Sequence, residues 1–212
     1  MKWFTIEACA GGGGSGFCVG APSGATIAGS GGSGAYARVT YTPSVFNTTS
    51  GIMPLGELMI NVGVGGAGAT DNTFTKAQDG GPTIISRQYL DQNENTQLET
   101  LFMLAGGQGS LSALSSSGLF YLTVPGASGG NLYTVTDTGL GMLQLRGQNG
   151  QVSLYYQPAD WIVIGNGGLT PIGTDNTLST GYGQGAAGNY ATTGDSAGSN
   201  GNQGICIITE YY

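Results

Sequence analysis

The sequence predicts an all-β, β-sandwich-like fold in which glycine-rich segments pack as polyproline II or polyglycine II helices and no significant α-helix forms. Three observations predict this fold. Glycine supplies 42 of the 212 residues, short apolar strands run directly into glycine tracts, and glycine recurs within these tracts with a period of three. We expect residues 1–212 to form a single glycine-rich β domain.

The abundance of glycine has a physical reason. Glycine costs about 0.5–1 kcal/mol relative to alanine at an ordered position, so a folded chain uses it where a side chain would not fit. Hydrophobic residues make up 39% of the chain, and 11 residues are Tyr, which is too much apolar material for a disordered linker. No sustained Gly-X-Y frame runs through the sequence, which excludes collagen.

Strands and glycine tracts alternate in the framework, residues 1–110. An apolar, strand-forming run ends where a tract begins, and the arrangement recurs at irregular spacing, so the chain is not a solenoid of fixed repeat. The strand and tract pairs are 6–10 with 11–16, 26–28 with 29–34, 58–62 with 63–68, 101–105 with 106–109 and, beyond the framework, 161–164 with 165–168.

The first three tracts share the pattern G-x-G-G-x-G. Read at a period of three, two columns hold glycine and the third admits a small residue such as Ser30, Ser33 or Ala67. A polyproline II helix has three residues per turn and no internal hydrogen bonds, so its glycine faces let neighbouring backbones bond to one another. We expect the non-glycine column to face an edge or a neighbouring sheet.

The same tracts match the dinucleotide-binding signature G-x-G-x-x-G, but the residues that follow them argue against that function. The signature needs a helix whose N-terminus holds the pyrophosphate. Residues 17–20, 35–40 and 69–72 do not begin helices, and no Gly-Lys-Ser/Thr motif is present. We therefore expect no cofactor.

The remaining strands follow from alternation and turn signals. Strand 36–42 stops at Pro43, and the polar turn 91–95 joins strands 82–90 and 96–105. Residues 111–160 read as a conventional β insertion, with strands at 119–124, 131–136, 142–146 and 152–157. Asn149-Gly150 predicts a hairpin turn between the last two. Residues 161–212 supply glycine-rich loops and a closing strand, 205–212.

The charge of the chain argues against nucleic acid as a partner, and its lack of His removes common catalytic groups. Five Lys and Arg stand against 12 Asp and Glu, for a net charge of −7, and the basic residues occur singly. Nucleic-acid binding needs clustered basic residues, so we exclude it. The chain has no His, which removes the commonest general base and zinc ligand.

Cys9, Cys18 and Cys206 show no C-x-x-C spacing, so neither a zinc site nor a dense disulfide scaffold is indicated. We interpret them as small buried hydrophobic residues, with a local bridge between Cys9 and Cys18 as the alternative. The N-terminus reads as a strand and not as a secretory signal. No apolar run approaches the ~20 residues of a membrane span, so we expect a soluble protein made in a cytosol.

Paired carboxylates are the one catalytic resource that the sequence offers, as in glycosidases. Most of the acidic residues fall in polar turns, and no Ser or Cys nucleophile has a His partner, so we expect no enzyme. Residues 91–95 begin like a calcium loop, but Thr96 stands in place of the tight-turn Gly and Phe102 in place of the bidentate Glu. We expect a solvated hairpin tip there, and no metal.

Loops rich in Tyr and amide side chains are the candidate binding surfaces, because these residue types recognise surfaces and sugars. The alternative is that the Tyr side chains cap the ends of the glycine bundle. The candidate loops are 69–79, 91–95 and 170–203. The candidate residues are Asp71, Asn72, Phe74, Asn93, Asn95, Tyr182, Gln184, Asn189 and Tyr190.

An ordered series of motifs resembles the glycine-rich domain of bacteriophage tail-fibre and adhesin proteins. The series contains IEACAGGGGSG at 6–16 and LMINVGVGGAG at 58–68, and it ends with the closing strand. The likeness covers residues 1–110 and 161–212, and the insertion 111–160 has no counterpart in it. The further motifs that carry it lie at 31–38, 80–86, 104–107 and 201–212.

The resemblance implies a virion component, made in the host cytoplasm and exposed on the particle exterior. Its loops would contact a host surface receptor, protein or polysaccharide, and its other partners would be virion proteins, with a homotrimer as one assembly that the family allows. No fibre-attachment segment is expected before Met1, which opens the first strand. A tail-fibre tip adhesin or spike is the leading hypothesis. The alternatives are a capsid or tail decoration or cement protein and, third, a polysaccharide depolymerase.

Overall fold

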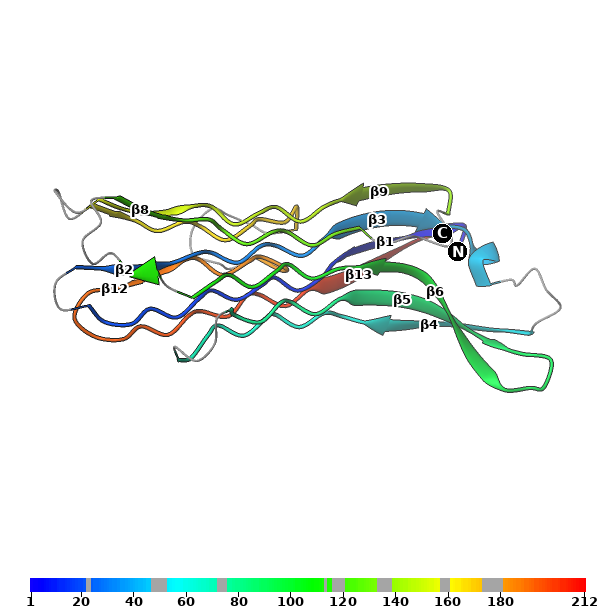
Figure 1. The fold of residues 1–212 in the computed structure, drawn as a ribbon. Coiled ribbons are helices and arrows are strands. Elements are labelled where there is room, and N and C mark those ends of the chain that lie inside the picture. Colours follow the sequence, from blue (N-terminus) through cyan, green and yellow to red (C-terminus); the bar gives the residue numbers. More distant parts are fainter. Residues whose placement is uncertain are drawn as a thin grey trace.

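The computed structural model describes residues 1–21, 24–46, 53–71, 76–112, 114–115, 121–132, 139–156, 161–172 and 181–212. The molecule is elongated, with β-strands at its two ends and undulating segments between them (Figure 1). Both chain termini lie at one end, which we call the terminal end. The strands β2 (Thr26–Ala28), β8 (Tyr121–Val124) and β12 (Asn189–Ala191) lie at the other, which we call the distal end.

Two antiparallel sheets form a β-sandwich at the terminal end. One has the order β13-β1-β3-β9, and the other has the order β4-β5-β6. Their bounds are β13 (Ile205–Tyr211), β1 (Trp3–Cys9), β3 (Tyr36–Tyr41), β9 (Gly141–Leu145), β4 (Met53–Asn61), β5 (Thr83–Leu90) and β6 (Thr96–Leu104), with a 3-10 helix η1 (Pro43–Phe46) after β3. Ile6 and Val39 of the first sheet pack in one core with Ile85 and Phe102 of the second.

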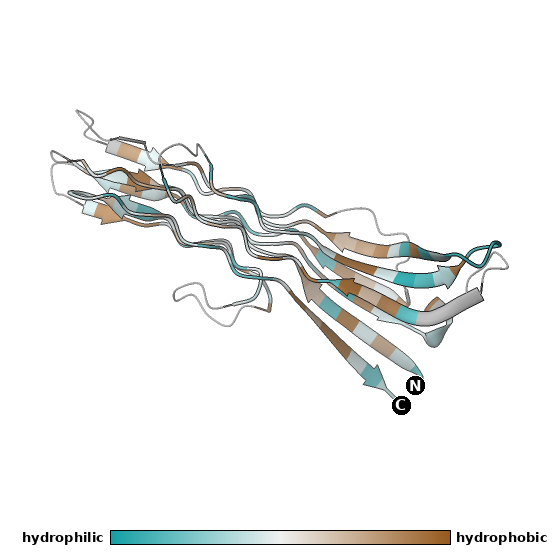
Figure 2. Ribbon diagram, turned by 90° about the horizontal axis from the view of Figure 1, so that it is seen from below, coloured by the Kyte–Doolittle hydropathy of each residue, from teal (hydrophilic) through white to brown (hydrophobic). Residues whose placement is uncertain are grey.

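A smaller pair of sheets stands at the distal end. One has the order β11-β10-β8, and the other has the order β12-β2-β7. The bounds not yet given are β11 (Trp161–Val163), β10 (Ser153–Tyr156) and β7 (Leu114–Ser115). Ile27 of β2 packs against Leu122 and Val124 of β8 and Tyr155 of β10. Hydrophobic residues lie in the strands at both ends (Figure 2). The four antiparallel sheets confirm the predicted all-β, sandwich-like fold.

Glycine-rich segments connect the two ends, and we call them together the glycine bundle. They are 10–16, 29–35, 62–69, 77–82, 105–110, 125–131, 146–151, 164–170, 183–188 and 198–204. Their backbone amides donate sideways to neighbouring segments. In the segment 10–16 the partner changes at every residue and returns at every third: Ala10 and Gly13 donate to 29–35, Gly11 and Gly14 to 77–82, and Gly12 and Ser15 to 198–204.

The carbonyl oxygens of segment 10–16 follow the same period. They accept from Gly107 and Ser110, from Gly66 and Ala69, and from Ala186. With the three partners of its amides, this segment therefore has six bonded neighbours. Three residues per turn is the period of a polyproline II helix, and the polyglycine II conformation stays a prediction that this period supports.

Close approach of backbones explains the glycines of the bundle. A Cβ atom at Gly12 would overlap the backbone carbonyl of Gln184, and one at Gly13 would overlap that of Gln108. Of the glycines in the described segments, Gly139 and Gly183 have positive φ, so every bundle glycine except Gly183, at the start of segment 183–188, is there for space and not for a left-handed conformation. Packing of the side-chain-free faces replaces a hydrophobic core between the two ends.

One prediction about residues 111–160 was wrong. The Asn149-Gly150 hairpin does not form, because β9 pairs with β3 at the terminal end and β10 pairs with β8 and β11 at the distal end. Residues between them run along the bundle, where Gly150 donates to Ala127. The segment 111–160 is therefore interleaved with the framework. Most of its predicted strand 131–136 lies outside the described residues.

The non-glycine column is exposed at Val64 of the tract 63–68, but its serines in the tract 29–34 are buried against neighbouring segments. Ser30 and Ser33 are fully enclosed. The Ser30 hydroxyl donates to the carbonyl oxygen of Gln151 at 2.7 Å, and the Ser33 hydroxyl oxygen accepts from the amide of Gln148 at 2.8 Å. The two hydroxyls therefore link the segment 29–35 to the segment 146–151 by side-chain hydrogen bonds.

The three cysteines are free thiols, so the bridge between Cys9 and Cys18 is not formed. Cys9 and Cys18 are buried, as interpreted from the sequence, and Cys206 is half-buried. Burial raises the pKa of each thiol to about 11. A thiol with so high a pKa stays protonated near neutral pH and is a poor nucleophile.

Candidate functional site

The loops predicted to bind do not meet on one surface. The turn 91–95 joins β5 and β6 at the terminal end, whereas Tyr190 lies in β12 at the distal end (Figure 1). Asp71 follows the segment 62–69 and is half-buried. Asn72 and Phe74 lie outside the described residues. A partner that engages the β5–β6 turn therefore sits at the opposite end of the molecule from one that engages β12.

Asp91 organises the turn that contains Asn93 and Asn95. Its Oδ1 accepts the backbone amides of Asn95 at 2.9 Å and Asn93 at 2.8 Å, and its Oδ2 accepts from the Gln97 side chain at 3.2 Å. The amide of Asn95 is the largest cause that holds the pKa of Asp91 below its ordinary value of 3.8. Both asparagines are exposed. The predicted solvated hairpin tip is confirmed.

Tyr182 and Gln184 have opposite exposures. Tyr182 is 42% exposed, and Gln184 is 2% exposed. The Gln184 side-chain oxygen accepts from the amide of Gly181 at 3.1 Å, which fixes the turn before the segment 183–188. Gln184 therefore has a structural position, and its side chain is not at the surface where a receptor contact was predicted.

Asn189 and Tyr190 differ in the same way. The Asn189 side-chain amide donates to the carbonyl oxygens of Ser196 and Ala197, both at 2.9 Å, and its oxygen accepts from the Ser196 hydroxyl at 3.0 Å. These bonds hold the returning chain against β12. Tyr190 is 49% exposed at the distal end. Of this pair, only the Tyr190 side chain is presented to a partner.

The distal end carries an aromatic surface that the sequence analysis missed. Tyr156 and Trp161 are directly opposite each other across β10 and β11, and Trp161 is 69% exposed. Opposite residues of an antiparallel pair point to the same face. Among the residues whose side chains the structure describes, Leu154, Val163 and Thr123 share that face by register. We call these five residues the distal aromatic face.

A sequence signal for this face did exist. Tyr156 and Trp161 are five positions apart around the short link 157–160, which is the spacing of two strands that turn back on each other. Alternation along β10 then puts Tyr155 inside and Tyr156 outside. Both strands were predicted, but 152–157 was expected to pair with 142–146 across the Asn149-Gly150 turn, and no partner was predicted for 161–164.

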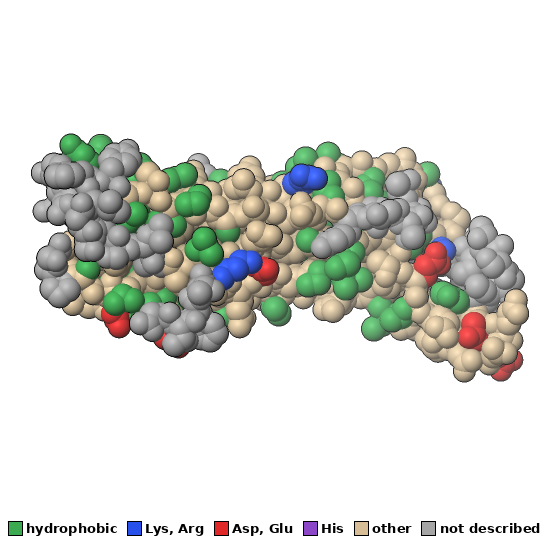
Figure 3. Space-filling model, in the orientation of Figure 1, with side chains coloured by type: hydrophobic (Ala, Val, Ile, Leu, Met, Phe, Trp, Pro, Cys, Tyr) green, Lys and Arg blue, Asp and Glu red, His purple; other side chains and the backbone are tan. Residues whose placement is uncertain are grey.

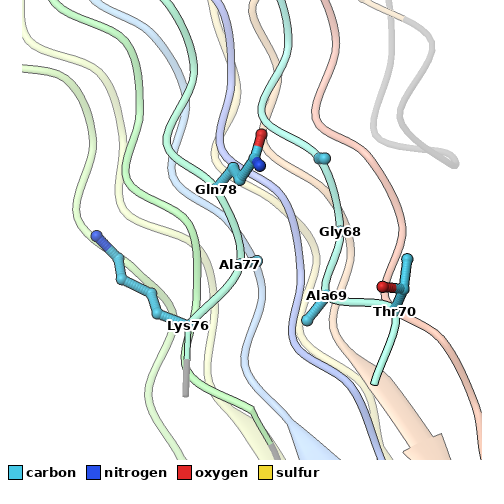
Figure 4. A pocket seen from close by; sticks show the side chains of 7 residues that line it. Gly68, Ala69, Thr70, Lys76, Ala77 and Gln78 are labelled. Atoms are coloured by element: carbon cyan, nitrogen blue, oxygen red, sulfur yellow. The ribbon is translucent and has the colours of Figure 1, made fainter. Parts of the chain in front are cut away.

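Hollows on the side of the bundle are small. One of about 170 Å³ lies between residues 67–70 and 76–78 (Figure 4). Lys76 extends away from Ala69 and Thr70 in this view. A second hollow of about 240 Å³ is lined by Asp79, Pro82, Met103 and Asn131 among others. Both are below the ~300 Å³ of typical small-ligand pockets, so neither is the main candidate.

Charged side chains are sparse on the face drawn in Figure 3. Lys76 pairs with Asp79 at 2.7 Å, and Arg87 pairs with Glu99 at 2.6 Å. In the described part of the chain, no group of three or more His, Cys, Asp or Glu residues is placed to hold a metal ion. Nor do the described residues include a helix of the length and apolarity needed to cross a membrane.

No family model matches the chain, and no curated protein is similar to it in sequence.

Proposed function

We propose that this chain is the non-enzymatic receptor-binding protein of a bacteriophage particle, a tail-fibre tip adhesin or spike that contacts the host surface through its distal end. The polarity of the molecule supports this proposal. β1 and β13 pair along their whole length, from Trp3 opposite Tyr211 to Cys9 opposite Ile205, so both ends of the chain leave the molecule together. A segment linked covalently to either end of the chain would therefore join at the terminal end.

The opposite end is left free to meet a receptor. It exposes Trp161, Tyr156 and Tyr190, and aromatic side chains of this kind are enriched where proteins bind partners. The glycine bundle holds this surface away from the terminal end through backbone hydrogen bonds in several directions. A stiff spacer between an attachment end and a recognition end is the arrangement that an adhesin needs.

Attachment to other virion proteins is placed at the terminal end in this proposal. The closing strand β13 is an edge strand of its sheet. Ile207 and Ile208 point to opposite faces of this sheet and are 39% and 41% exposed. An apolar strand exposed at a sheet edge is a surface on which a further strand can pair, from another virion protein or from a second copy in a homotrimer.

A competition experiment tests the proposal. Purified protein is incubated with host cells before phage that carries it is added, and the rate of phage adsorption is measured. We expect the protein to slow adsorption, and the double variant Tyr156→Ala, Trp161→Ala to lose this effect. The matched control Asn93→Ala, Asn95→Ala changes two exposed residues at the terminal end and should compete like the unmodified chain.

The alternative of a decoration or cement protein gives a different result. Such a protein binds the particle and not the host cell, so no concentration of it slows adsorption. That result would reject the receptor-binding proposal.

A further inference from the structure

We propose that the distal aromatic face binds an uncharged polysaccharide chain of the host surface. This inference rests on the proposed function and names the chemical class of the receptor. The face consists of Tyr156, Trp161, Val163, Leu154 and Thr123, which share one side of the sheet β8–β10–β11 by register. Trp161 is 69% exposed on this face, which suits a long chain that extends beyond the protein.

Buried residues on the reverse side of the sheet fix the side on which Tyr156 and Trp161 lie. On the reverse side of the same sheet, Tyr155 and Leu122 are buried in the distal core together with Ile27. Their burial fixes which side of β10 and β11 faces water, because successive side chains of a strand point to opposite faces. Tyr156 and Trp161 are therefore both on the water-facing side of the sheet, and binding requires no change in the two strands.

Two neighbouring aromatic rings suit sugars for an electrostatic reason. A sugar ring has a face of C–H groups and a rim of hydroxyl groups. The face of an aromatic ring carries partial negative charge, so it attracts the C–H face of a sugar, whose hydrogens are slightly positive. Adjacent strands are about 4.8 Å apart, so rings on β10 and β11 can serve successive parts of one sugar chain. The hydroxyl of Thr123, exposed on the same face, can bond to the rim.

Charge selects among the ligands that stack on aromatic rings. Nucleobases stack equally well, but their phosphates require basic residues along the groove. The strands β8, β10 and β11 read YLTV, SLYY and WIV and contain no Lys or Arg. With a net charge of −7, the protein also repels acidic polysaccharides. The ligand class that remains for this face is a neutral glycan.

Binding is measured with the full chain and defined probes. Soluble neutral glycans (dextran, a galactomannan and a mannan) and one acidic glycan (hyaluronan) are titrated against the protein, with Trp fluorescence and affinity gel electrophoresis as readouts. We expect at least one neutral glycan to bind and hyaluronan not to. Trp161→Ala should weaken binding about tenfold or more, the effect of losing one stacking platform, and Trp161→Phe should retain most of it.

Trp3→Ala is the matched control, because it removes a partly exposed Trp at the terminal end and should leave glycan binding unchanged. Circular dichroism verifies that each variant is folded. Failure of every neutral glycan to bind, or equal binding by Trp161→Ala and the unmodified chain, overturns the inference.

Treated host cells separate this inference from the proposed function. Periodate oxidises surface sugars, and protease removes surface proteins. We expect the protein to bind protease-treated cells and not periodate-treated cells. Binding that survives periodate but not protease overturns the glycan inference and leaves receptor binding standing. Binding to neither untreated nor treated cells overturns both.

Discussion

The amide of Gly13 donates to the carbonyl oxygen of Gly32 at 2.9 Å, and this bond joins the two most enclosed segments of the glycine bundle. The segment 29–35 has six bonded neighbours, as 10–16 does. Its amides donate to 183–188, to 105–110 and to Gln148, and its carbonyl oxygens accept from 10–16, from 125–131 and from Gly168. Backbone contact at the Gly13–Gly32 bond therefore stands where other proteins have a hydrophobic core.

Gly13→Ala should destabilise the fold strongly. Its Cβ would overlap the carbonyl of Gln108, and that carbonyl is fixed because it accepts from Gly32. Overpacking that forces a backbone shift costs about 3 kcal/mol. Gly141→Ala is the control, because an added Cβ there meets nothing within 4 Å, and we expect a change within about 0.5 kcal/mol. Denaturant unfolding measures both, and equal losses would contradict the packing account.

Ser33→Ala should lower the free energy of unfolding by about 0.5–1.5 kcal/mol, because it removes the hydroxyl that accepts from the Gln148 amide in a partly buried hydrogen bond. Ser128→Ala, at an exposed position of the bundle, should change it by less than about 0.5 kcal/mol. Thermal unfolding of the two variants provides the comparison. If Ser33→Ala is as stable as the unmodified protein, the hydroxyl does not serve as a structural bond.

Acid should open the turn 91–95 before the rest of the fold. The folded-state pKa of Asp91 is lowered, first by the Asn95 amide, so its stabilisation is present above the ordinary value of 3.8 and is lost as pH falls through the folded pKa. Hydrogen exchange of the Asn93 and Asn95 amides between pH 7 and 2 measures this loss. In Asp91→Asn the pH dependence should disappear. Its persistence in that variant would assign the change to another group.

The stability of the fold at alkaline pH should depend on Tyr36. Burial, together with the hydrogen bond that its hydroxyl donates to Glu7 Oε1 at 2.8 Å, raises the pKa of Tyr36 to about 12. Because the folded state favours the protonated phenol, the stabilisation is complete below the ordinary pKa of 10 and is lost between pH 10 and 12. Absorbance of tyrosinate should show a group that titrates near pH 12 and is missing in Tyr36→Phe. Identical titration curves for the two proteins would refute this.

The strands that were predicted correctly have a strong local pattern. Residues 6–10, 36–42 and 205–212 combine apolar or β-branched residues with a clear stop, and they correspond to β1, β3 and β13. The short strand β12 was missed because Asn189 and Tyr190 lie in a polar, glycine-rich stretch without such a pattern. Its pairing with β2 decides its conformation.

The candidate site was harder to predict than the strands. Gln184 and Tyr182 have the same local composition around them, yet one is buried and the other exposed. Asn189 was selected as an adaptable contact residue, but its amide is used to hold Ser196. In a bundle of this kind, the neighbours of a polar side chain belong to segments distant in the sequence, so composition cannot separate a structural amide from a recognition amide.

The all-β class, most of the strands and the three-residue period of the glycine tracts could be predicted from the sequence, because apolar alternation and the need for side-chain-free contacts are local properties. The tertiary structure decided which tract lies beside which, that Asn149-Gly150 is not a turn, and that Tyr156 and Trp161 meet at the end opposite both termini. The physical reason is that glycine tracts are chemically alike. Each offers the same amides and carbonyls, so the flanking strands and their two cores set the neighbours, and with them the surface that is presented.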